Sequence, residues 1–366
     1  MTALTIGIDS LTTMQHEIVS LEFFKVRLFQ PLALVLTMLY AVSHSVAQDT
    51  PLLSGGVGFF TNTTDGKSTF MPIIEPLLAA PIGQRFLIES RAALLETWAP
   101  KDNGQSGYDH THFIGLTYLE GDYLASRHFT LVGGSFLLPF GSYNERLSPI
   151  WISNFQDGPS ASNIGLMSTG TGVGGMVRGS ALSRPKYSID YAAYFSALSS
   201  NSQFTAKRSA GGRVDLYLPE KRLEIGFSYS RLLQDVDENF FGTHVWWEPK
   251  DTGLRIRSEF NRGQHAQGYW IEADYRLQRF GGPESWIGRF EPVFRMQQTF
   301  HLDNSTNGDG VSLVNTQRAD FGLDYNLPHN TRILTSYSRQ FSSTGDHNIW
   351  ETGIVYRFLF PAWKGK

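Results

Sequence analysis

Apolar and polar residues alternate with a period of two through much of this sequence, and this pattern constrains the fold most. The segment YWIEADYRL (269–277) places Tyr, Ile, Ala, Tyr and Leu on one face of an extended strand and Trp, Glu, Asp and Arg on the other. The same division recurs in segments 187–196, 213–218, 222–230, 254–261 and 320–327. Because successive side chains of a strand point to opposite faces, each segment predicts a strand with one apolar and one ionic side.

Two all-β architectures fit such strands. A soluble antiparallel sandwich hides its apolar faces, whereas a transmembrane barrel turns them outward around a polar interior. Aromatic residues lie near strand ends on the apolar faces, as expected for girdles at two membrane interfaces: Tyr187, Tyr229, Trp247, Tyr269, Tyr275, Tyr325, Tyr337, Trp350 and Phe360. We therefore predict an all-β chain forming a transmembrane antiparallel β-barrel of about 14 strands, between about 12 and 16, with a secreted binding sandwich as the alternative.

Composition narrows the function classes. The chain has no cysteine, which excludes disulfides, thiolate metal sites and cysteine nucleophiles. Lys and Arg number 31 against 34 Asp and Glu, so no nucleic-acid partner is predicted. The hydrophobic fraction of 41% is low for one packed core of 366 residues, but it suits a barrel, in which only every second strand residue must be apolar.

The N-terminal region reads as a targeting segment. Lys25 and Arg27 precede an apolar stretch (28–42), and the small residues Ser45-Val46-Ala47 follow, which predicts a secretory signal peptide cleaved before Gln48. A membrane anchor is the alternative, although the apolar stretch contains Gln and Pro and is shorter than about 20 residues. The expected organisation is an N-terminal extension with signal peptide (1–47), a periplasmic segment leading into the barrel (48–82), the barrel (83–360) and a tail (361–366).

The C-terminal region supports export to a membrane. In the segment IWETGIVYRFLF (349–360), Trp, Thr, Ile, Tyr, Phe and Phe alternate with Glu, Gly, Val, Arg and Leu. The segment resembles the terminal strand of bacterial outer-membrane proteins, which the barrel-assembly machinery reads. Here six further residues follow Phe360. We expect that machinery and outer-membrane lipid as partners, and the outer membrane of a Gram-negative cell as the location.

The ionic faces predict a charged interior. The candidate pore-lining and constriction residues are Glu145, Arg146, Asp157, Arg213, Arg255, Arg257, Glu259, Glu272, Asp274, Arg276, Arg289 and Arg295. Further charges assigned inward are Arg85, Arg91, Arg222, Arg318, Arg332, Arg357, Glu89, Asp190, Asp215, Glu224, Glu248, Glu291, Asp320, Asp324 and Glu351. The balance of signs favours weak ion selectivity, and pairing across strands that merely stiffens the interior is the alternative.

One connection stands out by its length. After GGSFLLPFG (133–141) the predicted strand breaks at Pro139, and residues 139–166 follow before the next Gly-rich strand. The apolar portion SPIWISNF argues against disorder. We predict that this loop folds into the barrel as a constriction, with Glu145 and Arg146 facing the passage and Trp151 against the wall. An external loop over the barrel mouth, or a subunit contact, is the alternative.

The strand and turn GGSFLLPFG, in a chain of this size ending in an aromatic strand, resembles the porins grouped with the phosphate-selective porins O and P. The resemblance implies sixteen-stranded trimeric barrels, with arginine ladders and a lysine cluster that guide anions. This chain departs from the group, because the mature strands carry few lysines and carboxylates match arginines; the lysines are Lys186, Lys207, Lys221 and Lys250. We therefore expect a passive, water-filled channel for small hydrophilic solutes or ions. A homotrimer is one assembly that the resemblance implies, and the sequence does not decide the oligomeric state.

An outer-membrane lipase or protease is the alternative function. Its candidate residues are His110, His112, His244 and His265. The first two share a strand face and could hold a metal together with Asp109 or Asp122. An H-x-H pair beside a polar loop is usually a solvated strand end. The sequence contains no G-x-S-x-G, H-E-x-x-H or P-loop motif. No catalytic residue, cofactor or metal site is therefore predicted.

Overall fold

The computed structural model describes residues 50–101, 106–234, 237–303 and 310–361. The chain divides into two compact units, of which the larger (50–81 and 85–364) is the subject below. Within the smaller unit, which takes in 1–49, 82–84 and 365–366, only the turn at 82–84 is described. The predicted signal peptide and almost all of the predicted tail lie outside the described residues.

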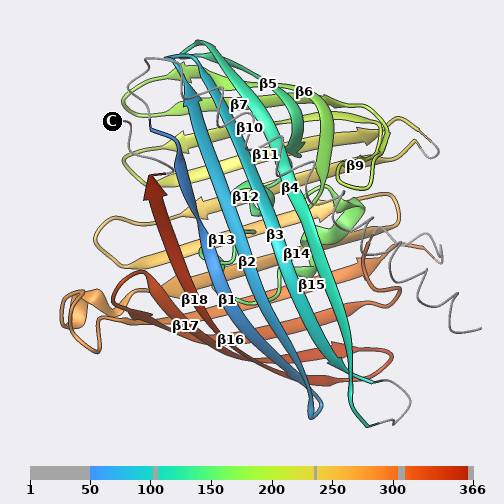
Figure 1. Ribbon diagram of the computed structural model, residues 1–366, viewed down its shortest axis with the longest axis vertical. Helices are drawn as coiled ribbons and strands as arrows, with labels where there is room; N and C mark the ends of the chain where they lie inside the picture. The colour runs from blue at the N-terminus through green and yellow to red at the C-terminus, as the bar shows by residue number, and fades with distance from the viewer. Residues whose placement is uncertain (1–49, 102–105, 235–236, 304–309, 362–366) are drawn as a thin grey trace, which may run out of the picture. The chain divides into compact units, whose positions relative to one another are not determined.

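The larger unit is a closed antiparallel barrel of sixteen strands (Figure 1). Each strand pairs with its neighbours along the chain, and the first strand closes the ring by pairing with the last over thirteen positions, from Leu52↔Pro361 to Thr64↔Ile349. Closure leaves no strand edge unpaired, as a barrel in lipid requires. The all-β barrel prediction and its upper limit of sixteen strands are confirmed.

The barrel strands are β1 (Leu52–Thr64), β2 (Lys67–Ile82), β3 (Phe86–Pro100), β4 (Tyr108–Ser126), β5 (Phe129–Leu137), β6 (Thr171–Ser183), β7 (Ser188–Ser196), β10 (Ser209–Leu218), β11 (Leu223–Leu232), β12 (Asn239–Trp247), β13 (Leu254–Arg262), β14 (Ala266–Tyr275), β15 (Phe290–His301), β16 (Thr316–Leu327), β17 (Thr331–Ser342) and β18 (His347–Pro361). A separate two-stranded sheet joins β8 (Ser199–Ser200) to β9 (Thr205–Ala206). The described helices are short: α2 (Tyr143–Arg146) and the 3₁₀ turns η1 (Ser160–Leu166) and η2 (Leu277–Phe280).

The structure corrects the predicted role of residues 48–82. They do not form a periplasmic segment leading into the barrel, because β1 and β2 occupy residues 52–82 and pair with each other and with β18. Glycines interrupt the alternation in β1, and Pro72 and Pro76 interrupt it in β2. Both residue types read as strand breakers, so the two strands missing from the predicted fourteen lie here.

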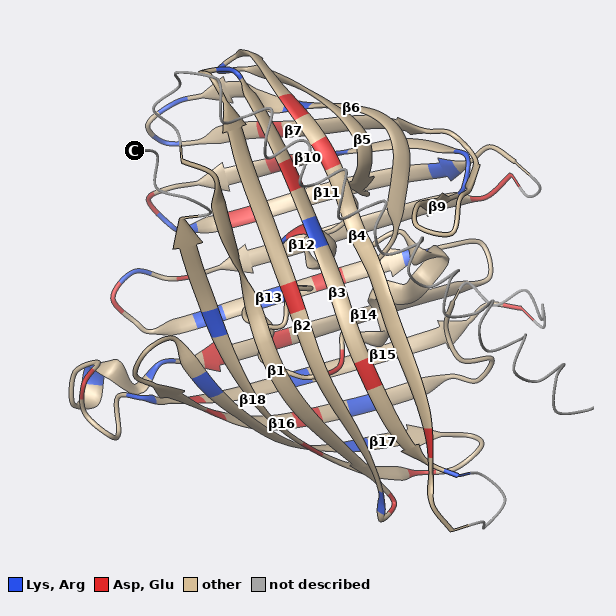
Figure 2. Cartoon of the chain, viewed as in Figure 1, with Lys and Arg blue, Asp and Glu red and all other residues tan. Residues whose placement is uncertain are grey.

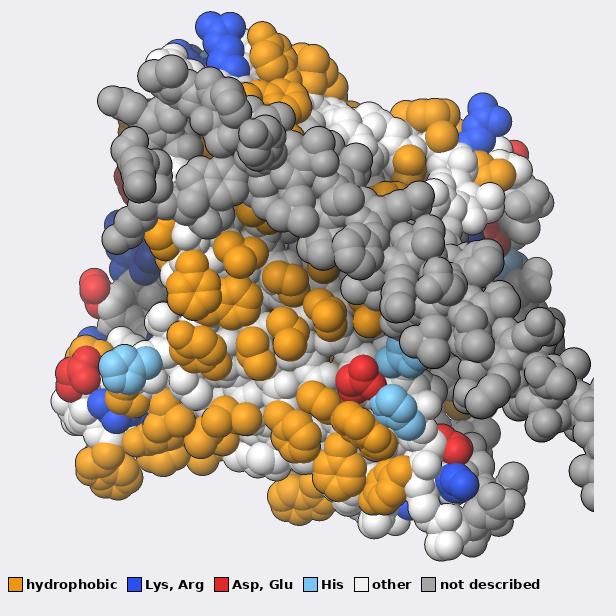
Figure 3. Space-filling model, viewed as in Figure 1, with side chains coloured by type: hydrophobic (Ala, Val, Ile, Leu, Met, Phe, Trp, Pro, Cys, Tyr) orange, Lys and Arg blue, Asp and Glu red, His pale blue; other side chains and the backbone are white. Residues whose placement is uncertain are grey.

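The alternating faces are placed as predicted. On β14, Ile271 points outward and is exposed, while Glu272 and Asp274 point inward and are buried. Phe227, Phe321 and the other exposed apolar strand residues form an outer belt, part of which covers the wall drawn in front in Figure 3. Acidic and basic positions are interleaved along the strands (Figure 2). No helix in the described ranges is long and apolar enough to cross a membrane.

The barrel has two unlike ends. At the loop end lie the connections after odd-numbered β1, β3 and β5, and at the other, the turn end, lie both ends of the barrel chain, residues 52 and 361. Turns at the second end are short, as between β4 and β5, except that residues 276–289 with η2 join β14 to β15. The larger of two buried apolar clusters among the described residues lies inside the barrel and includes Phe136 from β5, Phe240 from β12 and Ile164 from the connection between β5 and β6.

Candidate functional site

The connection between β5 and β6, residues 138–170 and here named the lumen loop, lies inside the barrel. Its base is closed by the Leu138 amide, which donates to the Gly170 carbonyl at 3.1 Å. The Asn144 side chain, on α2, donates to the same carbonyl at 2.7 Å. The sequence favours this entry because Pro139 ends the β5 ladder, and Gly141 (φ +63°) then turns the chain toward the wall. The predicted inward fold of residues 139–166 is thus seen in the structure.

Glu259 on β13 is the carboxylate that binds both halves of the lumen loop. It is fully buried. One oxygen accepts the Ser142 amide at 2.9 Å and the Tyr143 amide at 3.2 Å. The other accepts the Ser168 hydroxyl at 2.7 Å and the Asn261 side-chain amide at 2.7 Å. A Cβ at Gly141 would collide with this carboxylate, so the close approach of the loop requires glycine there.

Charged residues of α2 bind β10 and β11, two strands of the wall separated by β12 from β13, the strand that carries Glu259. Glu145 accepts a hydrogen bond from Arg213 on β10 at 2.6 Å. Arg146 donates to Glu224 on β11 at 2.6 Å, and its side chain stays 36% exposed. Both residues were predicted to face the passage, and the structure pairs each of them with the wall. Burial raises the pKa of the neighbouring Tyr143 to about 12, so the phenol stays neutral.

The lumen loop then crosses to the opposite wall. Ser148 accepts a hydrogen bond from Arg91 on β3 at 3.1 Å. The Ile150 amide donates to Glu75 on β2 at 3.1 Å. Trp151 packs over Gly56 of β1, where a Cβ would approach its ring to 2.9 Å. The predicted packing of Trp151 against the wall is therefore observed, and the loop bridges the width of the lumen.

The second half of the lumen loop returns along β14 to β17. Asn154 donates to Glu272 at 3.1 Å and to Asp274 at 3.2 Å. Phe155 lies under the Arg295 guanidinium, whose central carbon is 4.4 Å from the centre of the Phe155 ring. Asp157 accepts from Arg318 at 3.1 Å. Successive segments of the lumen loop are thus held by contacts first with one wall of the lumen and then with the other.

The predicted charges on β13 and β14 pair with one another, and with Glu291 of β15, along the same wall. Arg255 binds Asp274 at 2.8 Å and Glu291 at 3.1 Å. Arg257 pairs with Glu272 and is almost fully buried. Because arginine and carboxylate alternate on adjacent strands, the wall carries no large field of one sign. The alternative that these charges stiffen the interior describes this part of the wall.

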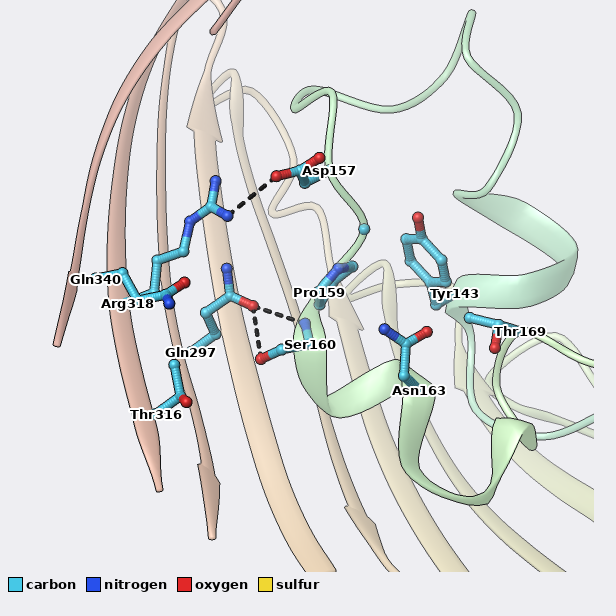
Figure 4. A pocket seen from close by; sticks show the side chains of 11 residues that line it. Tyr143, Asp157, Pro159, Ser160, Asn163, Thr169, Gln297, Thr316, Arg318 and Gln340 are labelled. Atoms are coloured by element: carbon cyan, nitrogen blue, oxygen red, sulfur yellow. Dashed lines mark hydrogen bonds and ion pairs between the residues drawn. The ribbon is translucent and has the colours of Figure 1, made fainter. Parts of the chain in front are cut away.

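A cavity of about 420 Å³ remains between the lumen loop and β15 to β17 (Figure 4). Its lining comes from the loop and the wall: Tyr143, Asp157, Gly158, Pro159, Ser160, Asn163, Thr169, Gln297, Thr316, Arg318 and Gln340. In the close view Arg318 and Gln297 reach from the strands toward Asp157 and Ser160. Gln297 accepts the Ser160 amide at 2.7 Å. Most of the lining side chains are polar, and they include charges of both signs, Asp157 and Arg318.

Not every predicted residue belongs to this site. Arg276 and Arg289 flank η2 in the connection at the turn end, where Arg276 is 3.7 Å from Glu291 and Arg289 is 3.4 Å from Glu284. They do not contact the lumen loop through any hydrogen bond described for these residues. Arg276 was placed inward because the predicted strand ran to Leu277, and the structure instead ends β14 at Tyr275; Arg289 lies one residue before β15 begins.

Sequence reasoning also missed some residues of the lumen. Glu120 and Asp122 on β4 both bind Arg178 of β6, at 3.4 and 2.5 Å. Their alternation with Leu119 and Gly121 was a usable signal. Glu75 had no such signal, because its neighbour Pro76 breaks the pattern.

The histidines considered for the alternative enzyme function do not come together in one site. On β4, His110 pairs with Glu96 and stacks on Trp98 with ring centres 4.9 Å apart, and both His110 and His112 are exposed. A bulge shifts the β3–β4 register between Arg91 and Ala92, which reverses the face of every residue beyond it. Asp122 therefore points into the lumen and cannot join a metal site with these histidines. His244 lies buried in the wall of β12, beside Asp215 and Glu224.

Comparison with known proteins identifies the fold. No family model and no curated protein matches the sequence. Three similar solved structures are Salmonella typhi OmpF in complex with daunomycin (TM-score 0.58, 12% identity, 84% of this chain and 98% of that chain), the anion-selective porin of Comamonas acidovorans (0.55, 9%, 84% and 99%) and the trimer form of OmpT, an outer membrane protein of Vibrio cholerae (0.54, 10%, 85% and 100%). The chain therefore has the barrel fold of bacterial outer-membrane porins.

Proposed function

We propose that this protein is an outer-membrane porin, a passive water-filled channel for small hydrophilic solutes or ions. The observation that carries the proposal is the lumen loop, which crosses a polar barrel interior and binds both walls. An apolar outer belt around an ionic lumen is the arrangement that lipid outside and water inside require. A loop held across such a lumen narrows the passage to the size of small solutes.

We propose weak ion selectivity. Around the lumen loop, Arg146, Arg213 and Arg318 are each within 3.1 Å of a carboxylate, so neighbouring charges largely cancel. The likeness to the phosphate-selective group rests on GGSFLLPFG, which forms the end of β5 and the start of the lumen loop. A small preference for either ion sign fits paired walls better than phosphate selectivity does. We propose no catalytic activity.

We propose that the chain is exported, assembled by the barrel-assembly machinery and trimeric. The pattern at Trp350 to Phe360 supports recognition by that machinery, since the outward residues within this segment are aromatic or aliphatic apart from Thr352. OmpT of Vibrio cholerae, a protein of similar fold, has a trimer form. Crosslinking of the protein in native outer membranes would show a trimer, and a monomer alone would contradict that assembly.

The channel is tested in planar bilayers. Purified protein should insert in discrete conductance steps, and a salt gradient should give a reversal potential close to zero. Liposome swelling with sugars of rising size should stop at small oligosaccharides, because the loop limits the passage. Absence of discrete steps would contradict the channel, and a large reversal potential would contradict weak selectivity alone.

A further inference from the structure

We propose that Asp215, Glu224 and His244 form a binding site for a borderline divalent transition-metal ion, of which Zn²⁺ is the representative. The three residues come from the adjacent strands β10, β11 and β12. In the register, Asp215 is opposite Gly226 and Gly226 is opposite His244. A Cβ at Gly226 would collide with the His244 ring and the Asp215 carboxylate. The glycine thus leaves the space in which these two side chains meet.

The spacing of the donor atoms matches a metal site. His244 Nε2 lies 3.1 Å from Glu224 Oε1 and 3.5 Å from Asp215 Oδ1. The three candidate ligand atoms all lie within 4.8 Å of one another. In a tetrahedral zinc site with bonds of about 2.0 Å, neighbouring ligand atoms are about 3.3 Å apart. The third distance, between the carboxylate oxygens of Asp215 and Glu224, is at most 4.8 Å. These two oxygens must move closer together for all three atoms to bind one ion.

The hydrogen bonding leaves an acceptor aimed at this point. Asp215 is 97% buried, since its relative exposure is 3%, and its Oδ1 has no hydrogen-bond partner. Its other oxygen accepts from Arg213 Nε at 2.8 Å. With a proton on Nε2, His244 donates a hydrogen bond to Glu224 Oε1 at 3.1 Å, whereas Asp215 Oδ1 is 3.5 Å from Nε2 and receives no hydrogen bond. A metal ion bonded to Asp215 Oδ1, Glu224 Oε1 and His244 Nε2 gives the unpaired Asp215 oxygen a partner, whereas His244 Nδ1 is buried and has no hydrogen-bond partner.

The surrounding charge also favours a cation. The carboxylates Asp215, Glu224 and Glu145 face two guanidinium groups, Arg213 and Arg146. With a neutral imidazole, this group has one more negative than positive charge, so a divalent ion reverses the excess without a large desolvated imbalance. The imidazole ligand selects zinc, nickel or copper over magnesium and calcium, which prefer oxygen ligands alone.

The site opens toward the lumen loop. Glu224 Oε1, the proposed ligand atom, is the oxygen to which Arg146 donates at 2.6 Å. The Arg146 side chain is partly exposed, so its displacement gives a metal ion access from the lumen. Metal binding and the Arg146 anchor of the loop therefore compete for one oxygen atom.

The test is Zn²⁺ binding by the refolded full-length protein in detergent, measured by isothermal titration calorimetry after treatment with chelator and in excess Mg²⁺. We expect one tight site per chain, weakened at least tenfold in His244→Gln and also in Glu224→Gln. The matched control is His347→Gln, because His347 is an imidazole at the loop end with one carboxylate, Asp65, at 2.6 Å. It should bind Zn²⁺ like the wild type.

Two results would overturn the proposal: wild-type protein that binds no Zn²⁺, or binding that persists unchanged in His244→Gln. Heat-modified mobility on gels shows whether each variant has folded. If His244→Gln does not fold, Asp215→Asn and Glu224→Gln carry the test, and unchanged binding in both overturns the proposal. The measurement does not depend on transport, so its failure leaves the channel proposal in place.

Discussion

Replacement of Glu259 by Gln tests the lumen loop most specifically, because one carboxylate holds both halves of it. Gln keeps the size of the side chain and turns one acceptor oxygen into an NH₂ donor. If the amide nitrogen takes the position nearest Ser142, it faces the backbone amides at 2.9 and 3.2 Å, and two donors lose their acceptor. If it takes the other position, the Ser168 hydroxyl can reverse, but the Asn261 amide still loses its bond.

The cheaper arrangement therefore loses at least one hydrogen bond to a charged group, which costs about 1.5 to 3 kcal/mol. That energy multiplies the population of detached loop by about 10 to 150. Barrel pairing does not involve the carboxylate, so the protein should fold normally. In single-channel recordings we expect brief transitions to higher conductance, and in limited proteolysis faster cleavage within residues 138–170.

The matched control is Glu120→Gln, a buried luminal carboxylate whose ion-pair partner is Arg178 at 3.4 Å, on the strand β6 rather than on the lumen loop. This variant should keep the conductance pattern and protease resistance of the wild type. If Glu259→Gln behaved like Glu120→Gln in both assays, the assignment of Glu259 as the anchor of the loop would be wrong.

Four further substitutions probe packing, backbone and the lipid-facing surface. Phe155→Ala removes the ring under a guanidinium and should destabilise the attached loop by about 3 to 5 kcal/mol, seen as faster hydrogen exchange of loop amides; unchanged exchange would contradict the packing. Gly165→Ala strains a φ of +61° and meets an aromatic ring of β12, so it should cost about 1 to 3 kcal/mol by the same measurement, whereas wild-type exchange would mean the backbone relaxes freely. Ile354→Arg in the middle of β18 should lower the free energy of unfolding in vesicles by about 2 to 4 kcal/mol, and Phe360→Arg near the strand end by at most about 1 kcal/mol; equal effects would refute the depth of the belt.

The fold was predictable where alternation is uninterrupted. The strand β13 carries a charged or polar residue at every second position, and β14 adds Glu272 and Asp274, so the pattern indicates which face is luminal. It failed at β1 and β2, where Gly56 and Gly58 stand on the luminal face of β1 and Pro72 and Pro76 stand on the outward face of β2, beside exposed Ile74. Gly56 is small because Trp151 from the lumen loop packs there, a long-range contact that local sequence does not reveal.

The site was predictable as a segment and less so as a set of contacts. The length and apolar content of residues 139–166 indicated a loop folded into the barrel, but Glu145 and Arg146 were predicted to face the passage and each pairs with the wall. Their partners depend on the closure of the barrel: Glu145 meets Arg213 across 68 positions and Asp157 meets Arg318 across 161. The bulge on β4 shows the limit of periodicity, because one inserted residue separates His110 and Asp122 onto opposite faces.

The central claim is that the lumen loop narrows an open polar barrel. The most direct measurement compares the single-channel conductance of the wild type with that of a variant in which residues 143–158 are replaced by a short Gly-Ser linker. We predict stable insertion of both proteins and a clearly larger conductance step for the variant, with larger sugars admitted in liposome swelling. Equal conductance and an equal size limit in the two proteins would contradict the account.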